Sequence, residues 1–480
     1  MIRLNRSNFL YIIFCALLCA CLFFMAADNA SGQSLFEQKL EAQKIRATNI
    51  KNPIILVTIL FSILVFFLPR DRLFIPFIVA ACFIPTDQRI ILYGLDFTVL
   101  RILIIVAMAR IFFYKKRKPT MWCRFDFIII WWALSSSVVY IMLWGTLAAV
   151  TRKCGNLLDV LGIYWLFRYN IRSWDDIFLA LKTLAVCSVV MTFFVIPEWA
   201  TGKNPFSILG RVTTPIRGGK FRCQASFPHP IIMGLYWTAL FPLFIGMAKI
   251  IKRDKVLYVL AAVGCVVSIM ASNSSTTIGG LLIVSILLFS YGWRYKVKLG
   301  VVITFATLIA LHLIMNIRSG MPIWHLLARL NITGKSVAWH RFNLFDQFVR
   351  RFDEWWLLGM KSTAHWDPWG RLSDVTNQYV FEGVRGGLLG LVLFLTVLAN
   401  TFWCLVRHFQ TSNIASKEQL LAWYIWVSFM GYLAAFFAVS YFGQISVLWY
   451  FQLAITGFIY RKQLSTGINS SNQVKNHNEK

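Results

Sequence analysis

Charged residues are scarce in this sequence of 480 residues, and acidic residues are the scarcest among them. Only 14% of the residues are charged, with 20 Asp and Glu residues against 48 Lys and Arg residues. Soluble domains carry about 25% charged residues, so this composition argues against a soluble protein. Apolar runs of about twenty residues recur along the chain, and each can cross a bilayer as a helix. The runs are continuously apolar and do not alternate, which favours helices over the strands of a barrel.

Motifs for metals and nucleotides are absent. The sequence has ten cysteines but no Cys-x-x-Cys pair and no zinc-ligand spacing, so it predicts no metal and no cofactor. A disulfide between Cys154 and Cys223 stays open, because both could face outward. The segment Gly334-Lys335-Ser336 resembles the end of a phosphate-binding P-loop, but Arg329 occupies the place of its first glycine. Two inverted repeats, which many transporters have, are not visible.

Basic residues indicate the topology. The formal net charge is +28, and most basic clusters fall in short loops on one side of the predicted helices, as in Lys115–Lys118 and Lys249–Lys255. Since basic loops collect in the cytoplasm, both termini are predicted there, and charge scattered in this way argues against nucleic-acid binding. The predicted helices, 12 to 14 in number because two are short, cover residues 8–27, 52–68, 73–86, 97–114, 125–148, 155–169, 176–197, 230–249, 256–272, 277–293, 298–315, 386–406, 420–439 and 443–460.

The chain is thus predicted to be an all-α polytopic membrane protein in four parts. Residues 1–315 form an N-terminal transmembrane bundle, and residues 386–462 form the C-terminal transmembrane helices. Between them, residues 316–385 form one large extracytoplasmic loop, whose apolar periodicity predicts short helices. The polar residues 463–480 are predicted to be a disordered cytoplasmic tail.

Residues 199–229 form a second external segment, and this one breaks the charge rule. It carries several basic residues and no Asp or Glu, although the helix count places it on the outer face. An anionic ligand is the simplest reason for positive charge there, because arginine binds phosphate oxygens two at a time and glycines let backbone N–H groups turn toward an anion. A solvated loop that binds anionic lipid headgroups remains the alternative. The basic residues are Lys203, Arg211, Arg217, Lys220 and Arg222.

Groups able to move a proton lie in and beside these two external segments. His229 stands where the chain enters the membrane, and it is either a proton acceptor or a hydrogen-bonded structural residue. Residues 316–385 combine tryptophans with polar side chains, a composition that suits sugar binding but that ordinary packing explains as well. The polar candidates of this loop are His340, Arg341, His365, Asp374, Asn377 and Glu382.

The residues just named, in this order, resemble the superfamily of O-antigen ligases and O-antigen polymerases (Wzy-type), which are bacterial polysaccharide polymerases. The likeness covers roughly residues 200–405 and depends on the order of its segments more than on any one motif. The segments are Arg222–Leu240, with Phe227 and Pro228 before a helix that bears Gly234; the serine-rich Met270–Gly280; His340–Gly359; Thr376–Tyr379; and Glu382–Gly390.

The resemblance implies an inverting, metal-independent glycosyltransferase at the outer face of the bacterial inner membrane, which takes glycan from an undecaprenyl-pyrophosphate carrier. It also implies that Arg341 contacts the pyrophosphate, with Arg217 or Arg222 as its partner. The family's usual His-Asn pair holds the proposed base of the ligases, but Thr376 precedes Asn377 here. This departure points away from a ligase. The base stays open among Asp374, Glu382, His340 and His365.

A polymerase of lipid-linked repeat units for exopolysaccharide or O-antigen is therefore expected. Two alternatives stay open: an O-antigen ligase, and a flippase or other transporter of lipid-linked oligosaccharide. The long loop speaks against a flippase, which should have short outer loops. Expected partners are the undecaprenyl-pyrophosphate-linked glycan, membrane lipids, and a chain-length regulator and flippase of the same pathway. Further substrate-binding candidates are Arg211, Lys220, His229, Asn377 and Arg385.

Overall fold

Helices make up nearly all of the fold. The computed structural model describes residues 48–92, 95–113, 122–209, 214–329, 338–411 and 416–478. Two short hairpins are the sheet structure of this part of the chain, so the predicted helical class is confirmed. Six helical stretches among the described residues are long and apolar enough to cross a bilayer, namely Arg124–Trp144, Trp174–Thr201, Pro230–Ile250, Ser275–Ser319, Gln378–Gln410 and Lys417–Phe436.

Every predicted helix within the described residues falls on helix, and the first, 8–27, lies outside them. The elements of the first half are α3 (Asn52–Phe67), α4 (Phe74–Phe83), β1 (Arg89–Leu92), β2 (Leu95–Thr98), α5 (Val99–Phe113), α6 (Arg124–Trp144), α7 (Leu147–Leu157), the π-helical turn η2 (Leu158–Gly162), α8 (Ile163–Asn170) and α9 (Trp174–Thr201). Those of the second half are β3 (Ile216–Arg217), β4 (Lys220–Phe221), α10 (Pro230–Ile250), α11 (Lys255–Ala271), α12 (Ser275–Phe289), α13 (Val297–Ser319), α14 (Leu326–Arg329), α15 (Ala338–Arg350), α16 (Phe352–Trp355), α17 (Gln378–Gln410), α18 (Lys417–Phe436) and α19 (Ile445–Asn478).

Two features differ from the sequence-based expectation, and the predicted count of 12 to 14 helices stays a prediction. Among the described residues, six helical stretches meet the length and composition of a membrane span, and helices such as α4 are shorter. At 1.5 Å per residue, the ten residues of α4 cover about 15 Å, half of a hydrocarbon core of about 30 Å. Helix α19 continues through Asn478, where a disordered tail is predicted from residue 463. Cys154 and Cys223 are both free thiols, so no disulfide joins them.

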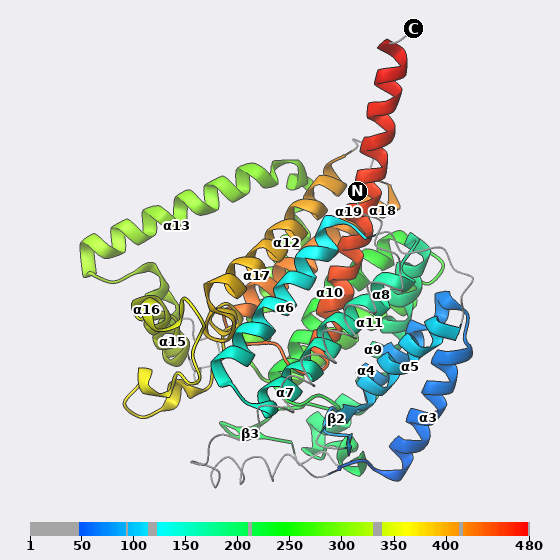
Figure 1. Ribbon diagram of the computed structural model, residues 1–480, viewed down its shortest axis with the longest axis horizontal. Coiled ribbons are helices and arrows are strands. Elements are labelled where there is room, and N and C mark those ends of the chain that lie inside the picture. The colour runs from blue at the N-terminus through cyan, green and yellow to red at the C-terminus, as the bar shows by residue number, and fades with distance from the viewer. Residues whose placement is uncertain are drawn as a thin grey trace.

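Helix α10 forms the centre of the bundle. It packs against α9, α11, α12, α18 and α19, and its aromatic residues Tyr236 and Trp237 are fully buried. Helix α13 is the opposite case, because it stands apart from the bundle (Figure 1) and contains no buried residue. Its main contacts are with the short helices η4 (Ser290–Lys296) and η5 (Ile323–His325) at its two ends. An apolar helix with this exposure suits a lipid environment and not water.

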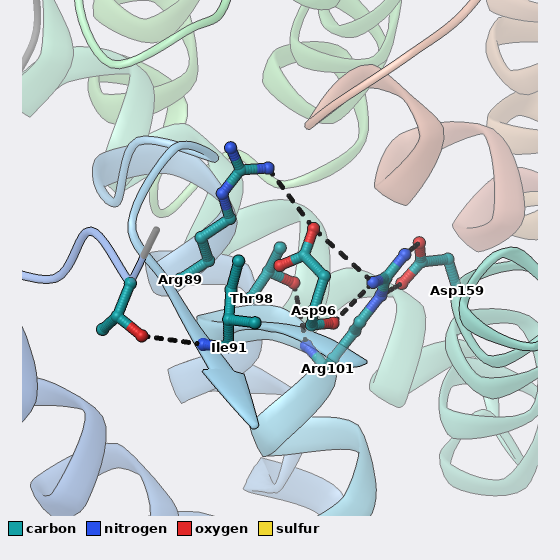
Figure 2. A network of polar contacts seen from close by, with 7 residues as sticks. Arg89, Ile91, Asp96, Thr98, Arg101 and Asp159 are labelled. Atoms are coloured by element: carbon teal, nitrogen blue, oxygen red, sulfur yellow. Dashed lines mark hydrogen bonds and ion pairs between the residues drawn. The ribbon is translucent and has the colours of Figure 1, made fainter. Parts of the chain in front are cut away.

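A polar network ties the β1–β2 hairpin to the helices beside it (Figure 2). Arg101 of α5 holds Asp159 of η2 with two hydrogen bonds, Nε to Oδ1 at 2.8 Å and Nη2 to Oδ2 at 2.6 Å. Its Nη1 donates to the backbone oxygen of Asp96 at 2.6 Å, and the Asp96 carboxylate accepts from Arg89 at 3.4 Å. The sequence predicts Arg101 and Asp159 as internal partners inside the bundle, and the structure confirms this. These charges hold the fold together, and we assign them no chemistry.

Residues 338–384 fold around a hydrophobic cluster of their own, and the short helices α15 and α16 predicted for this region are present. Trp355 stacks on Phe348 with the ring centroids 4.1 Å apart, so this tryptophan packs in the interior and is not a surface for sugar rings. The cluster consists of Leu344, Phe348, Trp355, Met360, Trp366, Leu372, Val375, Val380 and Val384.

Gly387 interrupts α17 and lets the α15–α16 region pack against the first turns of α17. Its φ of 64° and ψ of −171° are not helical, and only glycine adopts such a conformation readily. A Cβ atom at this position would lie 2.5 Å from the backbone oxygen of Leu357. Nearby, Met360 N donates to Val384 O at 2.7 Å. The kink therefore fixes the end of the α15–α16 region against the start of α17.

Candidate anion-binding site

Glu198 anchors the basic loop that follows α9. Its carboxylate is fully buried in the last turn of that helix. It accepts hydrogen bonds from Thr214 Oγ1 at 2.8 Å, Gln224 N at 3.0 Å and Ala225 N at 2.9 Å. Ala225 has a positive φ of 48°, an uncommon conformation for alanine that these bonds hold in place. Sequence alone does not predict this role, because Glu198 lies just before the basic segment. The sequence feature that could have pointed to this role is a single acidic residue at the end of a long apolar helix.

The last part of the loop, from Cys223 on, is packed inside the protein. Cys223 N donates to Ala271 O at 3.0 Å, and Gln444 Nε2 donates to Ser226 O at 3.0 Å. Cys223, Ser226 and Phe227 are all fully buried. A solvated loop, the alternative that the sequence leaves open, therefore does not describe this last part.

The middle of the loop forms the β3–β4 hairpin. Gly218 and Gly219 make its turn with φ values of 60° and 74°, and a two-residue turn with positive φ at both positions is the favoured type I′. The two glycines are therefore needed for the turn itself, and their presence does not require a bound anion. Arg217 and Lys220 face each other across the hairpin, and both are exposed. Like charges directly opposite are destabilising, so a ligand explains this pairing better than hairpin stability does.

Two arginines of this loop, Arg217 and Arg222, lie near a third from α15, Arg341. Arg222 is only 8% exposed, and Arg341 of α15 donates from Nη2 to Thr276 Oγ1, in the first turn of α12, at 2.9 Å. Burial, and after it the charge of Arg217, lowers the pKa of both Arg222 and Arg341. Arg217 therefore lies close enough to act on both. We call Arg217, Arg222 and Arg341 the arginine site.

Unsatisfied donors remain in the arginine site. The Nε atoms of Arg222 and Arg341 are buried without a hydrogen-bond partner among the described residues. A guanidinium stays charged in proteins, so the lowered pKa values reflect lost hydration and mutual repulsion, not neutral side chains. An anion with several oxygens would pair with these donors and offset the repulsion. A pyrophosphate has this charge and shape.

His229 caps helix α10 and faces the same region. Its Nδ1 accepts a hydrogen bond from Ile231 N at 3.1 Å, which leaves the ring proton on Nε2. Burial and the charge of Arg222 lower the pKa of His229, while Asp374 opposes them. The neutral ring is therefore a donor through Nε2, because the cap uses its one lone pair. Of the two roles that the sequence leaves open, this geometry favours the hydrogen-bonded one.

Asp374 is the predicted base that lies near His229. Its side chain is exposed, and its charge acts on His229. Its backbone oxygen accepts a hydrogen bond from His340 Nε2 at 3.2 Å, so His340 lies there too. A carboxylate beside a cationic site can accept the proton of a bound hydroxyl group. Among the predicted bases, Asp374 stays the leading candidate, as an exposed carboxylate whose charge acts on His229.

His365, another predicted base, is engaged in a contact with Glu354. Its Nε2 lies 2.8 Å from Glu354 Oε2. Burial raises the pKa of Glu354, but hydrogen bonds from Trp366, His365 and Arg351 outweigh it and bring the pKa to about 2. The pair therefore holds the α16 region together, and we assign His365 no role in proton transfer.

Asn377 serves the start of α17. It is fully buried, and its Oδ1 accepts from Tyr379 N at 2.9 Å as the helix cap. Its Nδ2 donates to Phe437 O at 3.3 Å. Both polar atoms are thus used by the fold, so the geometry does not support the predicted contact with substrate. Arg211, another predicted ligand, lies outside the described residues.

Glu382 and Arg385 lie at a different junction, where α6 and α17 pack together. The Glu382 carboxylate accepts from Trp132 Nε1 at 2.9 Å and from Gln378 Nε2 at 2.7 Å. Arg385 Nη1 donates to Lys361 O at 3.0 Å. Sequence proximity to Asn377 suggested that both belong with the arginine site, but their contacts belong to this junction.

Replacing Glu198 with glutamine is expected to loosen the basic loop. The amide keeps one acceptor oxygen but turns a donor toward backbone N–H groups, so a buried donor loses its partner at a cost of about 1–3 kcal/mol. The melting temperature of the purified protein should fall, and amide hydrogen exchange should rise within residues 214–227. Glu418→Gln is the matched control, because Glu418 is a 39%-exposed partner of Lys462. Unchanged exchange in the Glu198 variant would remove Glu198 as the anchor.

The fold is helical, with stretches long and apolar enough to cross a membrane, and it carries a group of arginines with unpaired buried donors among the described residues. Within the described part of the chain, no group of three or more His, Cys, Asp or Glu side chains could hold a metal ion. Neither a family model nor a curated protein matches this chain in sequence. Its activity is therefore inferred from the chemistry of the site.

Proposed function

We propose that this protein is a membrane glycosyltransferase that polymerises lipid-pyrophosphate-linked oligosaccharide repeat units, of exopolysaccharide or O-antigen, at the outer face of the bacterial inner membrane. The observation that carries the proposal is the convergence of Arg217, Arg222 and Arg341, with two buried guanidinium Nε donors left unpaired among the described residues. The resemblance of these same segments to O-antigen polymerases supports it.

Helix α10 supports the placement of the arginine site on the outer face. Its 21 residues rise about 31 Å, the thickness of a hydrocarbon core. His229 lies before its first residue, and Lys252, Arg253 and Lys255 follow its last. Because basic clusters mark the cytoplasmic side, the opposite end of α10 faces outward.

In the proposed reaction, a sugar hydroxyl of the acceptor attacks the anomeric carbon of the donor from the face opposite the pyrophosphate, so the configuration inverts. The bond from that carbon to the pyrophosphate oxygen breaks, and its electron pair passes to the pyrophosphate. Arg222 and Arg341 stabilise the charge that develops there, and Asp374 takes the hydroxyl proton. The donor is already activated by its leaving group, so the step needs no nucleotide and no metal.

Turnover by purified protein tests the proposal. Lipid-linked repeat units supplied to the protein in detergent should yield a ladder of longer saccharides, because no membrane barrier is needed for catalysis. The Arg341→Ala protein, purified in parallel, is the control for contaminating transferases. Consumption of donor with a single transfer to a different acceptor would point to a ligase. Absence of any transfer, with folded protein and varied conditions, would favour a flippase and end the proposal.

A further inference from the structure

A second group of cations lies where α6, α7 and α17 meet. Lys153 Nζ lies over the ring of Tyr140 at 4.4 Å from its centroid. Lys361 Nζ lies over the ring of Trp144 at 5.7 Å. Arg385 Nη1 donates to Lys361 O at 3.0 Å and so ties α17 to the loop. The group, which we call the α7–α17 cluster, consists of Arg152, Lys153, Lys361 and Arg385.

Positive charge is in excess in this cluster. Burial lowers the pKa of Lys153 to about 8; the charge of Glu382 opposes this shift, and those of Arg385 and Arg152 add to it. The Glu382 carboxylate, which acts on Lys153, already accepts hydrogen bonds on both oxygens from neutral side chains. The carboxylate that acts on Lys153 is therefore already occupied, whereas the cluster holds four basic side chains.

A spare donor and an apolar floor complete the cluster. The indole Nε1 of Trp144 is buried without a hydrogen-bond partner within the described residues. Tyr140 is buried beside it on the same helix. Cations over aromatic faces keep their N–H groups free for a further ligand on the outer side, while the rings suit an adjacent apolar chain. These features fit the headgroup of a phosphorylated lipid better than a free anion.

The α7–α17 cluster and the arginine site lie at the same end of the bundle. Helix α7 and the β3–β4 hairpin are both at the end opposite the C-terminus (Figure 1). Arg152 and Lys153 follow the apolar helix α6, whose first residue comes after the basic run 115–118. They therefore break the positive-inside bias in the same way as the basic loop does.

We propose that the α7–α17 cluster binds the pyrophosphate of a second lipid-linked saccharide while the arginine site holds the first. This inference rests on the proposed function, because chain extension joins two molecules that each carry a lipid pyrophosphate. Two diphosphates in one pocket would repel each other strongly, so two separate cationic sites are needed. The arginine site activates its pyrophosphate as a leaving group, and the α7–α17 cluster holds the acceptor, whose pyrophosphate stays intact.

Counting bound headgroups tests this directly. Native mass spectrometry of the full chain in detergent, with farnesyl pyrophosphate as the probe, should show two bound probes per chain. Arg341→Ala should lose one of them and Lys361→Glu the other, and the double variant should bind none. Lys361 is exposed, so its replacement leaves the fold intact, and Lys255→Glu at the far end of α10 is the charge-matched control. One probe on the wild-type chain, or two on Lys361→Glu, would refute the second site.

Competition identifies what the site recognises. Inorganic pyrophosphate should displace the probe from both sites, whereas phosphatidylglycerol at equal concentration should displace it from neither. Displacement from the α7–α17 cluster by phosphatidylglycerol would make it a site for bulk anionic lipid and overturn the inference. Two bound probes with no polymer in the turnover assay would refute the proposed function but not this site, and polymer with one bound probe would do the reverse.

The pH dependence separates the two sites. Lys153 faces Tyr140 from α6, Arg152 on its own helix, and Glu382 and Arg385 from α17. As the pH rises from 7 to 9 through its pKa of about 8, Lys153 loses its proton, and probe affinity at the cluster should fall by up to about tenfold. Affinity at the arginine site should stay constant, since guanidinium groups remain charged. Parallel loss at both sites would contradict the assignment of Lys153.

Discussion

Replacing Arg341 with alanine is expected to lower the rate of glycan transfer by about 10²- to 10³-fold, the usual loss when one preorganised donor to a developing charge is removed. Arg341 is fixed by its bond to Thr276 Oγ1, and its buried Nε is a donor without a partner in the described chain. Arg222→Ala should act in the same way. Initial rates of polymer formation by purified variants measure the effect.

Two controls make the Arg341 result specific. Arg350→Ala changes the same helix, but Arg350 is 68% exposed and pairs with Asp346 at 2.7 Å, so its rate should stay near that of the wild type. Arg341→Lys keeps the charge and loses the planar fork, so it should recover only part of the rate. Full-length polymer made at the normal rate by Arg341→Ala would remove this residue from the mechanism.

Replacing Asp374 with asparagine is expected to lower the turnover number by about 10²- to 10⁴-fold, the typical contribution of a general base. Its carboxylate is exposed, and its charge acts on His229. The Michaelis constant for donor should change little, because the arginines that hold the pyrophosphate are intact. Steady-state kinetics with varied donor separate the two parameters.

Asp353→Asn is the matched control for this substitution. Asp353 is an exposed acid in the same region, on α16, so its replacement removes the same charge without touching the arginine site. Asp374→Asn with a normal turnover number would transfer the role of base to another group. His340, which donates to the Asp374 backbone oxygen, would be the next to replace.

The helices were predictable because membrane spans need long apolar runs, and those runs are continuous in this sequence. The residues at which the helices begin and end were less predictable. The segment 155–169 reads as one apolar run, yet the structure breaks it with the π-helical turn η2, where Asp159 pairs with Arg101 across the bundle. The sequence indicates that these two charges are partners, but the change from α-helical to π-helical geometry leaves no signal in the apolar run. The β1–β2 hairpin, which carries the other end of the network, was not predicted either.

The arginine site was predictable as a charge anomaly, since five basic residues without an acid stand out on the outer side. The residues that position the arginine site were not predictable. Glu198 holds the loop through backbone N–H groups, and any residue type can supply those. Glu382 and Arg385 were predicted as site residues from their place in a linear motif. The fold instead turns this part of α17 toward α6.

The position of the arginine site relative to the membrane is the claim on which the rest depends. Labelling of a Lys220→Cys variant with a membrane-impermeant maleimide in intact cells measures it, with Arg253→Cys at the other end of α10 as the reference and the wild-type chain as the background for native cysteines. Lys220 and Arg253 are both exposed in the fold. We expect the Lys220→Cys variant to be labelled in intact cells and the Arg253→Cys variant only after the membrane is opened. The reverse pattern would place the arginines in the cytoplasm and contradict the proposed site.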